Sequence, residues 1–230
     1  MIVYAYNFQG GAVVETIVFV SQKGGTGKST LACCCAVAAE EAGHQVLLLD
    51  LDEQATAEAW YQNREEETPR LVKVTASELD NALATAQAQR FDIVIIDTPG
   101  RDEVSTTAAI RVADFCIVPC RPSATDMRAT PPTVGTMERL KKPFAFVLTQ
   151  TPARGYRIHE AEQGLSVLGL VAPVRTVLRT TYQDSIAGGL GPTEFDPEGK
   201  AAEEIRALWT WIEKKVRKGH YARQSQKNVA

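Results

Sequence analysis

A glycine-rich loop between a strand pattern and a helix pattern constrains the fold of this chain more than any other feature. Residues 16–20, TIVFV, have the β-branched and aromatic character of a buried strand, and SQKGGTGKST follows directly. A helical stretch, residues 29–42, begins at the end of the loop and stops at Gly43. This order of strand, glycine-rich loop and helix predicts a phosphate-binding loop, because glycines let backbone amides approach phosphate oxygens and a helix N-terminus attracts anions. A simple tight connection is the alternative interpretation.

The loop departs from the usual pattern G-x-x-x-x-G-K-[ST] at its first position, where Gln22 replaces glycine. An additional lysine, Lys23, stands just after it. We expect Lys28 to reach the outer phosphates, Ser29 to ligate Mg²⁺ and Thr30 to contact the innermost phosphate. The predicted nucleotide-binding residues of the loop are Lys23, Gly24, Gly25, Thr26, Gly27, Lys28, Ser29 and Thr30.

Strand and helix patterns alternate along the rest of the chain. The predicted strands are residues 16–20, 45–50, 71–74, 91–96, 115–119, 144–148 and 171–174. The predicted helices are residues 29–42, 56–64, 77–89, 105–112, 131–140, 157–168 and 200–218, and residues 188–199 form a loop rich in glycine and proline. The core strands are continuous apolar runs, as in strands covered on both faces. The sequence therefore predicts an α/β fold: a doubly wound, mostly parallel β-sheet with helices on both faces.

Acidic residues end two of these strands. LLLDLDEQ places Asp50 and Asp52 at the end of one, and FDIVIIDTPG places Asp97 at the end of another. In open α/β sheets ligands bind at the carboxyl ends of the strands, so these acids are expected at the same edge as the glycine loop. Asp97 is predicted to hold Mg²⁺ through water. For Asp50 the alternative is that it caps the next helix.

Composition excludes several classes of protein. Of the 230 residues, 44% are hydrophobic and 23% are charged, and the formal net charge is −3, so nucleic-acid binding would need a local basic patch. No apolar run approaches the roughly eighteen residues of a membrane span. Without a signal-peptide pattern we expect a cytoplasmic protein with reduced cysteines. The cysteines, which lack metal-ligand spacing and are interpreted as packing residues, are Cys33, Cys34, Cys35, Cys116 and Cys120.

Four motifs together carry a family resemblance: KGGTGKST, LLLDLDEQATAEAW, FDIVIIDTPG and ADFCIVPCRPSATDM. In this order they resemble the motifs of the ParA/MinD superfamily of deviant Walker ATPases, over residues 16–216. The loop of that family is K-G-G-x-G-K-[ST], and its early lysine, here Lys23, reaches the phosphates of the partner in a nucleotide-sandwich dimer. The resemblance therefore implies an ATP-dependent homodimer, because an added cation offsets triphosphate charge in a poorly hydrated interface.

The same resemblance assigns further roles. Asp52 would orient the attacking water and is a possible metal ligand, Asp97 would serve Mg²⁺, and Asp126 matches an acid near the dimer surface. Many relatives have D-x-D-P-Q, whereas this chain has Glu53 in place of the proline. Loss of the fixed φ is expected to shift the Asp52 loop and slow hydrolysis. The predicted adenine-pocket residues are Thr149, Gln150, Pro173 and Arg175.

The resemblance is closest to short ParA-type partition proteins, which bind DNA without sequence preference as ATP dimers. A ParB-like partner stimulates their hydrolysis and releases them, which implies a nucleoid-associated protein. Phosphate contacts of this kind need cations. The predicted DNA-binding residues are Arg154, Arg157, Arg179, Lys214, Lys215, Arg217 and Lys218. The alternative for the basic end of the last helix is a solvated surface whose cations complement the helix dipole.

Two other functions remain as alternatives. A MinD-like protein would use a terminal amphipathic helix on membrane, and Ile205, Leu208, Trp209, Ile212 and Val216 do form one apolar stripe. We expect that stripe to pack on the domain itself. A small-molecule ligase of the dethiobiotin synthetase type is disfavoured by Lys23 and DLDEQ, and a nitrogenase-iron-protein function by the strand context of its cysteines. The predicted organisation is an extension at 1–15, an ATPase domain at 16–218 and a flexible tail at 219–230, with the extension either an edge strand or a disordered stub.

Overall fold

The computed structural model describes residues 14–54, 56–100 and 102–227, with side chains described through residue 218. The two alternatives for the N-terminal extension therefore fall on residues that lie almost wholly outside the described part of the chain.

One seven-stranded parallel sheet forms the centre of the molecule. Its order is β3-β2-β4-β1-β5-β6-β7, and every pair of neighbours runs parallel. The strands are β1 Glu15–Phe19, β2 Val46–Asp50, β3 Arg70–Lys73, β4 Ile93–Asp97, β5 Phe115–Cys120, β6 Phe144–Leu148 and β7 Leu170–Val171. This confirms the predicted doubly wound α/β fold.

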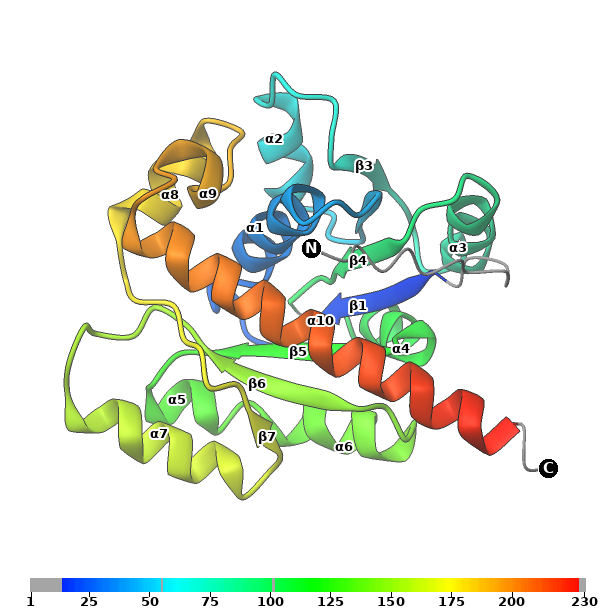
Figure 1. The fold of residues 1–230 in the computed structure, drawn as a ribbon. Coiled ribbons are helices and arrows are strands. Elements are labelled where there is room, and N and C mark those ends of the chain that lie inside the picture. Colours follow the sequence, from blue (N-terminus) through cyan, green and yellow to red (C-terminus); the bar gives the residue numbers. More distant parts are fainter. Residues whose placement is uncertain (1–13, 55, 101, 228–230) are drawn as a thin grey trace, which may run out of the picture.

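Helices cover both faces of the sheet, and α10 runs diagonally across one of them with α1 on the same side (Figure 1). The helices are α1 Lys28–Glu41, α2 Thr56–Gln62, α3 Leu79–Ala88, α4 Glu103–Val112, α5 Ala124–Met127, α6 Pro131–Arg139, α7 Tyr156–Ser166, α8 Thr180–Ala187, α9 Pro192–Phe195 and α10 Lys200–Lys227. Each predicted helix is present within a few residues of its expected bounds, apart from the end of α10.

Alternate side chains of the central strands enter two separate cores. Ile17 and Phe19 pack with α1 and α10 on one face, and Val18 packs with the helices of the other. All five cysteines are buried free thiols within these two cores, which confirms their interpretation as packing residues. Sheet strands buried on both faces explain why the sequence shows continuous apolar runs rather than alternation.

The apolar stripe of α10 packs on the domain, as predicted. Its five side chains are each 3% exposed or less, so none of them is available to a membrane. Among the described residues, no helix combines the length and apolarity that crossing a bilayer requires. The expected end near residue 218 is wrong, because α10 continues to Lys227. The apolar stripe in the sequence ends at Val216, which is why the pattern predicted an earlier end for this helix.

Three short helices were missed in the sequence. α5, α8 and α9 fall in segments predicted as connections, and α9 lies inside the supposed loop at 188–199. Glu194 accepts a hydrogen bond from the Gly191 amide at 2.7 Å and also pairs with Arg64 of the segment after α2. Tertiary contacts of this kind stabilise helices that are too short to persist alone. β7 is also shorter than predicted, because it ends at Val171.

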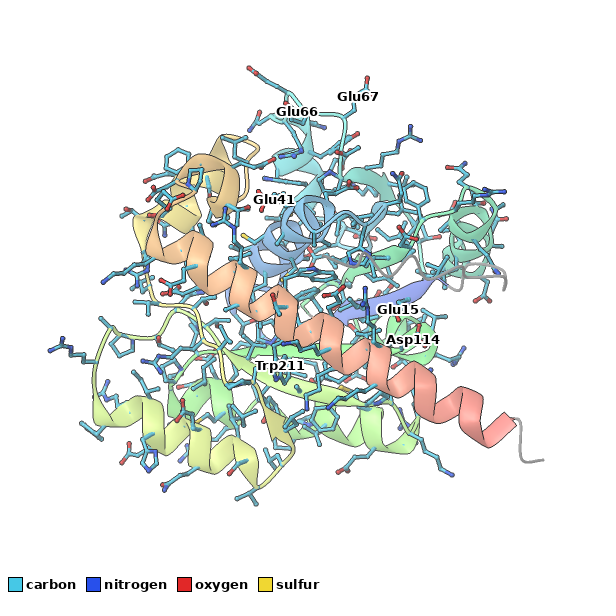
Figure 2. The ribbon with its side chains drawn as sticks, in the orientation of Figure 1. Glu15, Glu41, Glu66, Glu67, Asp114 and Trp211 are labelled. Carbon is cyan, nitrogen blue, oxygen red and sulfur yellow. The ribbon has the colours of Figure 1, made fainter. Side chains whose placement is uncertain are left out.

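Glu15, at the start of β1, provides a test of stability against pH. Burial raises the pKa of Glu15 to about 7. The charge of Arg217 opposes this rise, and the charge of Asp114, which is labelled next to Glu15 in Figure 2, adds to it. The carboxylates of Glu213 and Asp92 add to the rise. Because the folded state holds this proton more tightly than the unfolded chain, the free energy of unfolding falls as pH rises from about 4.5 to 7.

We therefore expect Glu15→Gln to raise the free energy of unfolding at pH 8 by about 1 kcal/mol after allowance for solvent screening. At pH 4, where Glu15 is protonated in both states, the variant and the wild type should differ little. Urea unfolding at the two pH values measures this difference. An equal gain at both values would show that the glutamine acts through packing rather than through the lost charge.

Candidate functional site

The sheet register brings the glycine loop and the acidic strand ends to one edge, called here the carboxyl edge. Asp97 of β4 stands opposite Phe19 of β1 on one side and Asp50 of β2 on the other. The glycine loop follows Phe19 directly, so loop and acids meet without any long connection. This is the arrangement predicted for a ligand site at the ends of parallel strands.

The loop owes its shape to two glycines with positive φ. Gly25 has φ +73°, and Gly27, the N-cap of α1, has φ +92°. Residues with a side chain rarely adopt these values, so a substitution at either position would strain the loop. Two side chains after β6 hold it in place: the Thr149 hydroxyl donates to the Thr26 carbonyl at 2.7 Å, and the Gln150 amide donates to the Gly25 carbonyl at 2.9 Å.

Lys28 lies inside the site with only 7% of its surface exposed. Burial lowers the pKa of its ammonium group, while the negative charges of Asp97 and Asp52 oppose that shift. A methyl group added at Gly100 would lie 3.5 Å from Lys28 Nζ and 3.6 Å from the Gly24 amide nitrogen. The turn after β4 therefore lies within van der Waals contact of the loop and of the Lys28 ammonium group.

Asp50 fixes the segment that carries Asp52. One carboxylate oxygen accepts from the Asp52 amide at 2.9 Å, and the other accepts from the Glu58 amide in the first turn of α2 at 3.1 Å. The alternative interpretation of Asp50 as a residue that caps the next helix is thus confirmed. Asp52 in turn accepts from the Gln54 amide at 3.0 Å, which closes the turn that contains Glu53.

Asp97 has the properties of a cation ligand. It is fully buried, and neither of its carboxylate oxygens has a hydrogen-bond partner in the described part of the protein. Burial raises the pKa of Asp97 to about 7; the Ser29 hydroxyl lies close enough to oppose this rise without forming a well-made hydrogen bond. A carboxylate rarely stays orphaned in a protein interior, so these two oxygens fit a Mg²⁺ ion.

The remaining metal ligands would come from outside the protein. Within the described residues, no group of three or more His, Cys, Asp or Glu side chains is arranged to hold a metal. Mg²⁺ normally takes one or two protein ligands together with water and substrate phosphates. Ser29 and Asp97 are the residues that would hold it, with Asp52 close by, and a cation there would neutralise phosphate charge.

Lys23 does not point into its own loop. Its ammonium group pairs with Asp126 at 3.1 Å, and Arg121 pairs with the same oxygen at 3.1 Å. The Ser123 hydroxyl donates to the other oxygen. Burial alone would raise the pKa of Asp126, but the Ser123, Arg121 and Lys23 contacts outweigh it and lower the pKa below its usual value. We call Lys23, Arg121 and Asp126 the ion triad.

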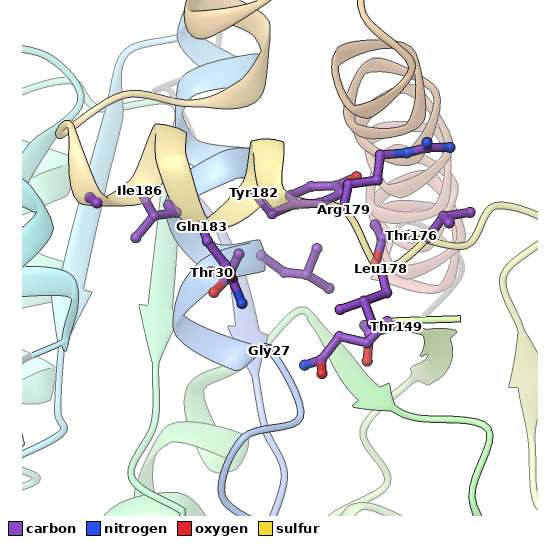
Figure 3. A pocket seen from close by; sticks show the side chains of 13 residues that line it. Gly27, Thr30, Thr149, Thr176, Leu178, Arg179, Tyr182, Gln183 and Ile186 are labelled. Atoms are coloured by element: carbon purple, nitrogen blue, oxygen red, sulfur yellow. The ribbon is translucent and has the colours of Figure 1, made fainter. Parts of the chain in front are cut away.

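A pocket of about 400 Å³ opens beside the loop, within the size range of small-molecule sites. Gly27, Thr30, Thr149 and Gln150 border it on the loop side. α8 covers it with side chains that include Tyr182, Gln183 and Ile186 (Figure 3). The residues that line it from the segment before α8 and from α8 itself are Thr176, Val177, Leu178, Arg179, Tyr182, Gln183, Ile186 and Ala187. Its position beside the phosphate loop suits a nucleotide base.

Of the residues predicted to contact adenine, Thr149 and Gln150 line this pocket. Pro173 and Arg175 do not, because the segment after β7 enters the pocket only from Thr176 onward. α8 was not predicted from the sequence. Its only signal was the spacing of Tyr182 and Ile186, which is too short a pattern to separate a helix from a loop.

The predicted DNA-binding cations lie in three separate places. Arg157 borders an open hollow together with Lys23 at the carboxyl edge, following the exposed Arg154. Arg179 turns away from the base pocket toward α10 and pairs with Glu204 at 2.8 Å (Figure 3). The seven predicted cations therefore do not form one continuous surface, and the guanidinium group of Arg179 is paired with Glu204.

The third group lies at the opposite edge of the sheet. Arg217 lies close enough to Glu15, at the start of β1, for its charge to lower the pKa of that carboxyl group, whereas Lys23 follows the end of the same strand. Lys215 packs over the ring of Trp211 at 5.4 Å, and Arg217 pairs with Glu213 at 2.7 Å while remaining 58% exposed. We call Lys214, Lys215, Arg217 and Lys218 the α10 basic surface.

Comparison with known proteins gives consistent matches. Residues 17–208 match the family described as the CobQ/CobB/MinD/ParA nucleotide binding domain. The maintenance of carboxysome distribution protein A of Halothiobacillus neapolitanus is 25% identical, covering 84% of this chain and 94% of that protein. Protein IncC of Escherichia coli is 28% identical, covering 88% of this chain and 70% of that protein.

The fold itself has a solved counterpart. The septum site-determining protein MinD of Pyrococcus horikoshii, complexed with Mg-ADP, superimposes with a TM-score of 0.74. The match covers 90% of this chain and 99% of that protein at 17% sequence identity. At this level of identity the likeness concerns the fold alone.

Proposed function

Because the chain belongs to the CobQ/CobB/MinD/ParA nucleotide-binding family and is an ATPase of that family, we propose that it is a partition or positioning ATPase. In this proposal ATP and Mg²⁺ close a homodimer, the dimer holds DNA through its phosphates, and hydrolysis releases it. The observation that carries the proposal is the place of Lys23, which is paired outside its own phosphate loop and 29% exposed on an open hollow.

The chemistry follows from the residues of the carboxyl edge. Lys28, from the phosphate loop, supplies positive charge to the bound triphosphate, and the positive φ at Gly25 and Gly27 gives the loop the shape that brings backbone amides to the phosphates. Asp52 lies on a turn whose backbone is held by a hydrogen bond to the Asp50 carboxylate, so it can orient a water molecule without a change in the conformation of that turn. Lys23 of one copy would reach the phosphates of the other, where little water remains to screen the charge.

The proposed partners follow from the relatives. The similar proteins include one named for carboxysome distribution, IncC and a ParA protein, so the proposed cargo is a plasmid, a chromosome or a protein assembly. A ParB-like partner would stimulate hydrolysis, and the ATP-bound dimer would associate with the nucleoid in the cytoplasm. The burial of the α10 stripe favours DNA over membrane as the surface on which this protein works.

We place the DNA contact on the α10 basic surface. Its side chains occupy successive turns of one helix, and Lys214, Arg217 and Lys218 are exposed. Cations on such a surface bind the phosphate backbone without reading sequence, and each contact adds to the dependence on salt. Arg154 and Arg157 form the second candidate group at the carboxyl edge.

The test is binding of unrelated duplex DNA in ATP, in ADP and without nucleotide, repeated over a series of salt concentrations. We expect binding in ATP alone, with an affinity that falls steeply as salt rises. Alanine at Lys214, Arg217 and Lys218 together should reduce the slope of log affinity against log salt by roughly 2 to 3, about one for each phosphate contact.

The matched variant replaces Arg154 and Arg157 by alanine. If that variant loses the salt dependence and the α10 variant keeps it, the DNA surface lies at the carboxyl edge instead. DNA binding of equal strength in all three nucleotide states would contradict the proposed switch. Absence of DNA binding from an intact ATP-dependent dimer would direct the search to liposomes and protein partners.

A further inference from the structure

The ion triad holds more positive than negative charge. Two cations share one oxygen of Asp126, and that carboxylate is only 3% exposed. In a buried site, removing one partner of a charge pair is strongly unfavourable when it leaves the other charge alone. Lys23 can therefore leave Asp126 easily only if another group continues to satisfy the carboxylate.

Arg121 is placed to do this. Its Nη2 atom already donates to Asp126 Oδ1 at 3.1 Å, and Ser123 already donates to Oδ2. Arginine keeps its charge under all ordinary conditions and has several donors in a rigid group. Its Nε is buried, and no hydrogen-bond partner for it occurs in the described part of the chain. This N–H group can therefore donate a further hydrogen bond to Asp126 if the site rearranges.

We propose that Arg121 is a positioning residue that keeps Asp126 paired when Lys23 departs, and so permits Lys23 to reach the nucleotide of a second copy. The inference rests on the proposed function, since it concerns the lysine that would cross the dimer. It adds a requirement that Lys23 alone does not imply: without Arg121, Asp126 retains Lys23 and the dimer weakens.

The same geometry offers a competing role for Arg121. A methyl group at Gly25 would lie 4.0 Å from Arg121 Nη1, so the guanidinium group borders the phosphate loop of its own chain. If Arg121 bound phosphate directly, its loss would weaken nucleotide binding by the monomer. If it serves Asp126, nucleotide binding by the monomer should stay unchanged.

The experiment compares Arg121→Gln, Arg121→Lys, Asp126→Asn and the double variant Arg121→Gln/Asp126→Asn. Sedimentation with a non-hydrolysable ATP analogue gives the dimer dissociation constant, and titration with ADP gives the nucleotide affinity of the monomer. We expect Arg121→Gln to raise the dimer dissociation constant at least about tenfold, because Lys23 is then the only cation on Asp126. Arg121→Lys, which keeps the charge, should be affected less.

The double variant tests whether Arg121 acts through Asp126. Its Asp126→Asn change removes the negative charge that retains Lys23, so adding it to Arg121→Gln should restore the dimer to within about threefold of the wild type. A defect that persists in the double variant would overturn the proposal, as would an Arg121→Gln dimer of normal strength or a loss of ADP affinity. If the wild type itself forms no ATP-dependent dimer, the proposed function fails first, and that result is separate from any effect of Arg121.

Discussion

An Asp52→Ala variant is expected to bind ATP with near-normal affinity and to hydrolyse it at least about 100-fold more slowly than the wild type, the range typical for loss of a group that activates water. Asp50 holds the Asp52 amide at 2.9 Å, and the turn closes on the Gln54 amide, so the carboxylate stands preorganised beside the phosphate loop. Phosphate release under saturating ATP measures the loss. Because hydrolysis ends the ATP state, the variant should also remain dimeric and bound to DNA.

Glu53→Gln is the matched control for this prediction. It changes the neighbouring acid on the same turn without removing the carboxylate of Asp52, so its turnover should stay within about threefold of the wild type. The variant Glu53→Pro introduces the proline that the family resemblance leads us to expect, and it tests whether its absence slows hydrolysis. Normal turnover in Asp52→Ala would mean that another group positions the water.

A Lys23→Ala variant is expected to lose the ATP-dependent dimer, with an increase of about 100-fold or more in its dissociation constant. One unit charge about 4 Å from a phosphate is worth about 4 kcal/mol at an effective dielectric constant near 20. The monomer should still bind nucleotide, because Lys28 and the loop amides remain. Light scattering with a non-hydrolysable analogue measures the dimer, and nucleotide titration at low protein concentration measures the monomer.

Lys28→Ala separates the two lysines. It removes the cation buried in the site itself, so it should reduce nucleotide binding by the monomer, a loss that Lys23→Ala should not share. Lys23→Arg keeps the charge but changes its shape and reach, and intermediate dimer strength is expected. An intact ATP-dependent dimer in Lys23→Ala would remove this lysine from the mechanism and leave its pairing with Asp126 as a purely structural contact.

The predictions for Asp52 and Lys23 depend on two separate groups of charged side chains. Lys28, Asp52 and Asp97 influence one another inside a single chain, which is why the pKa of the lysine falls on burial and is partly restored by the two acids. Lys23 is held apart from them by Asp126. Nucleotide binding and dimerisation can therefore be lost separately, and that separation is what a switch driven by ATP requires.

The elements that the sequence predicted correctly are those whose signals are local. The order of strand, glycine loop and helix around Gly27 depends on residues within a few positions of one another, and so do the apolar runs of β2, β4 and β5. The parallel arrangement follows from the alternation of strands and helices. Because the carboxyl ends of such strands meet at one edge, the positions of Asp52 and Asp97 followed as well.

The sequence by itself thus determined the fold class, the phosphate loop and the acids around it, since backbone conformation and burial pattern are encoded over short distances. Only the tertiary structure decided which distant residues meet. Arg64 and Glu194, which are 130 positions apart, form an ion pair that holds α9 next to the segment after α2. Asp126 likewise pairs with the distant Lys23. The predicted cations lie in three separate places for the same reason: contacts between segments far apart in the sequence depend on the folded path of the chain, which no local pattern records.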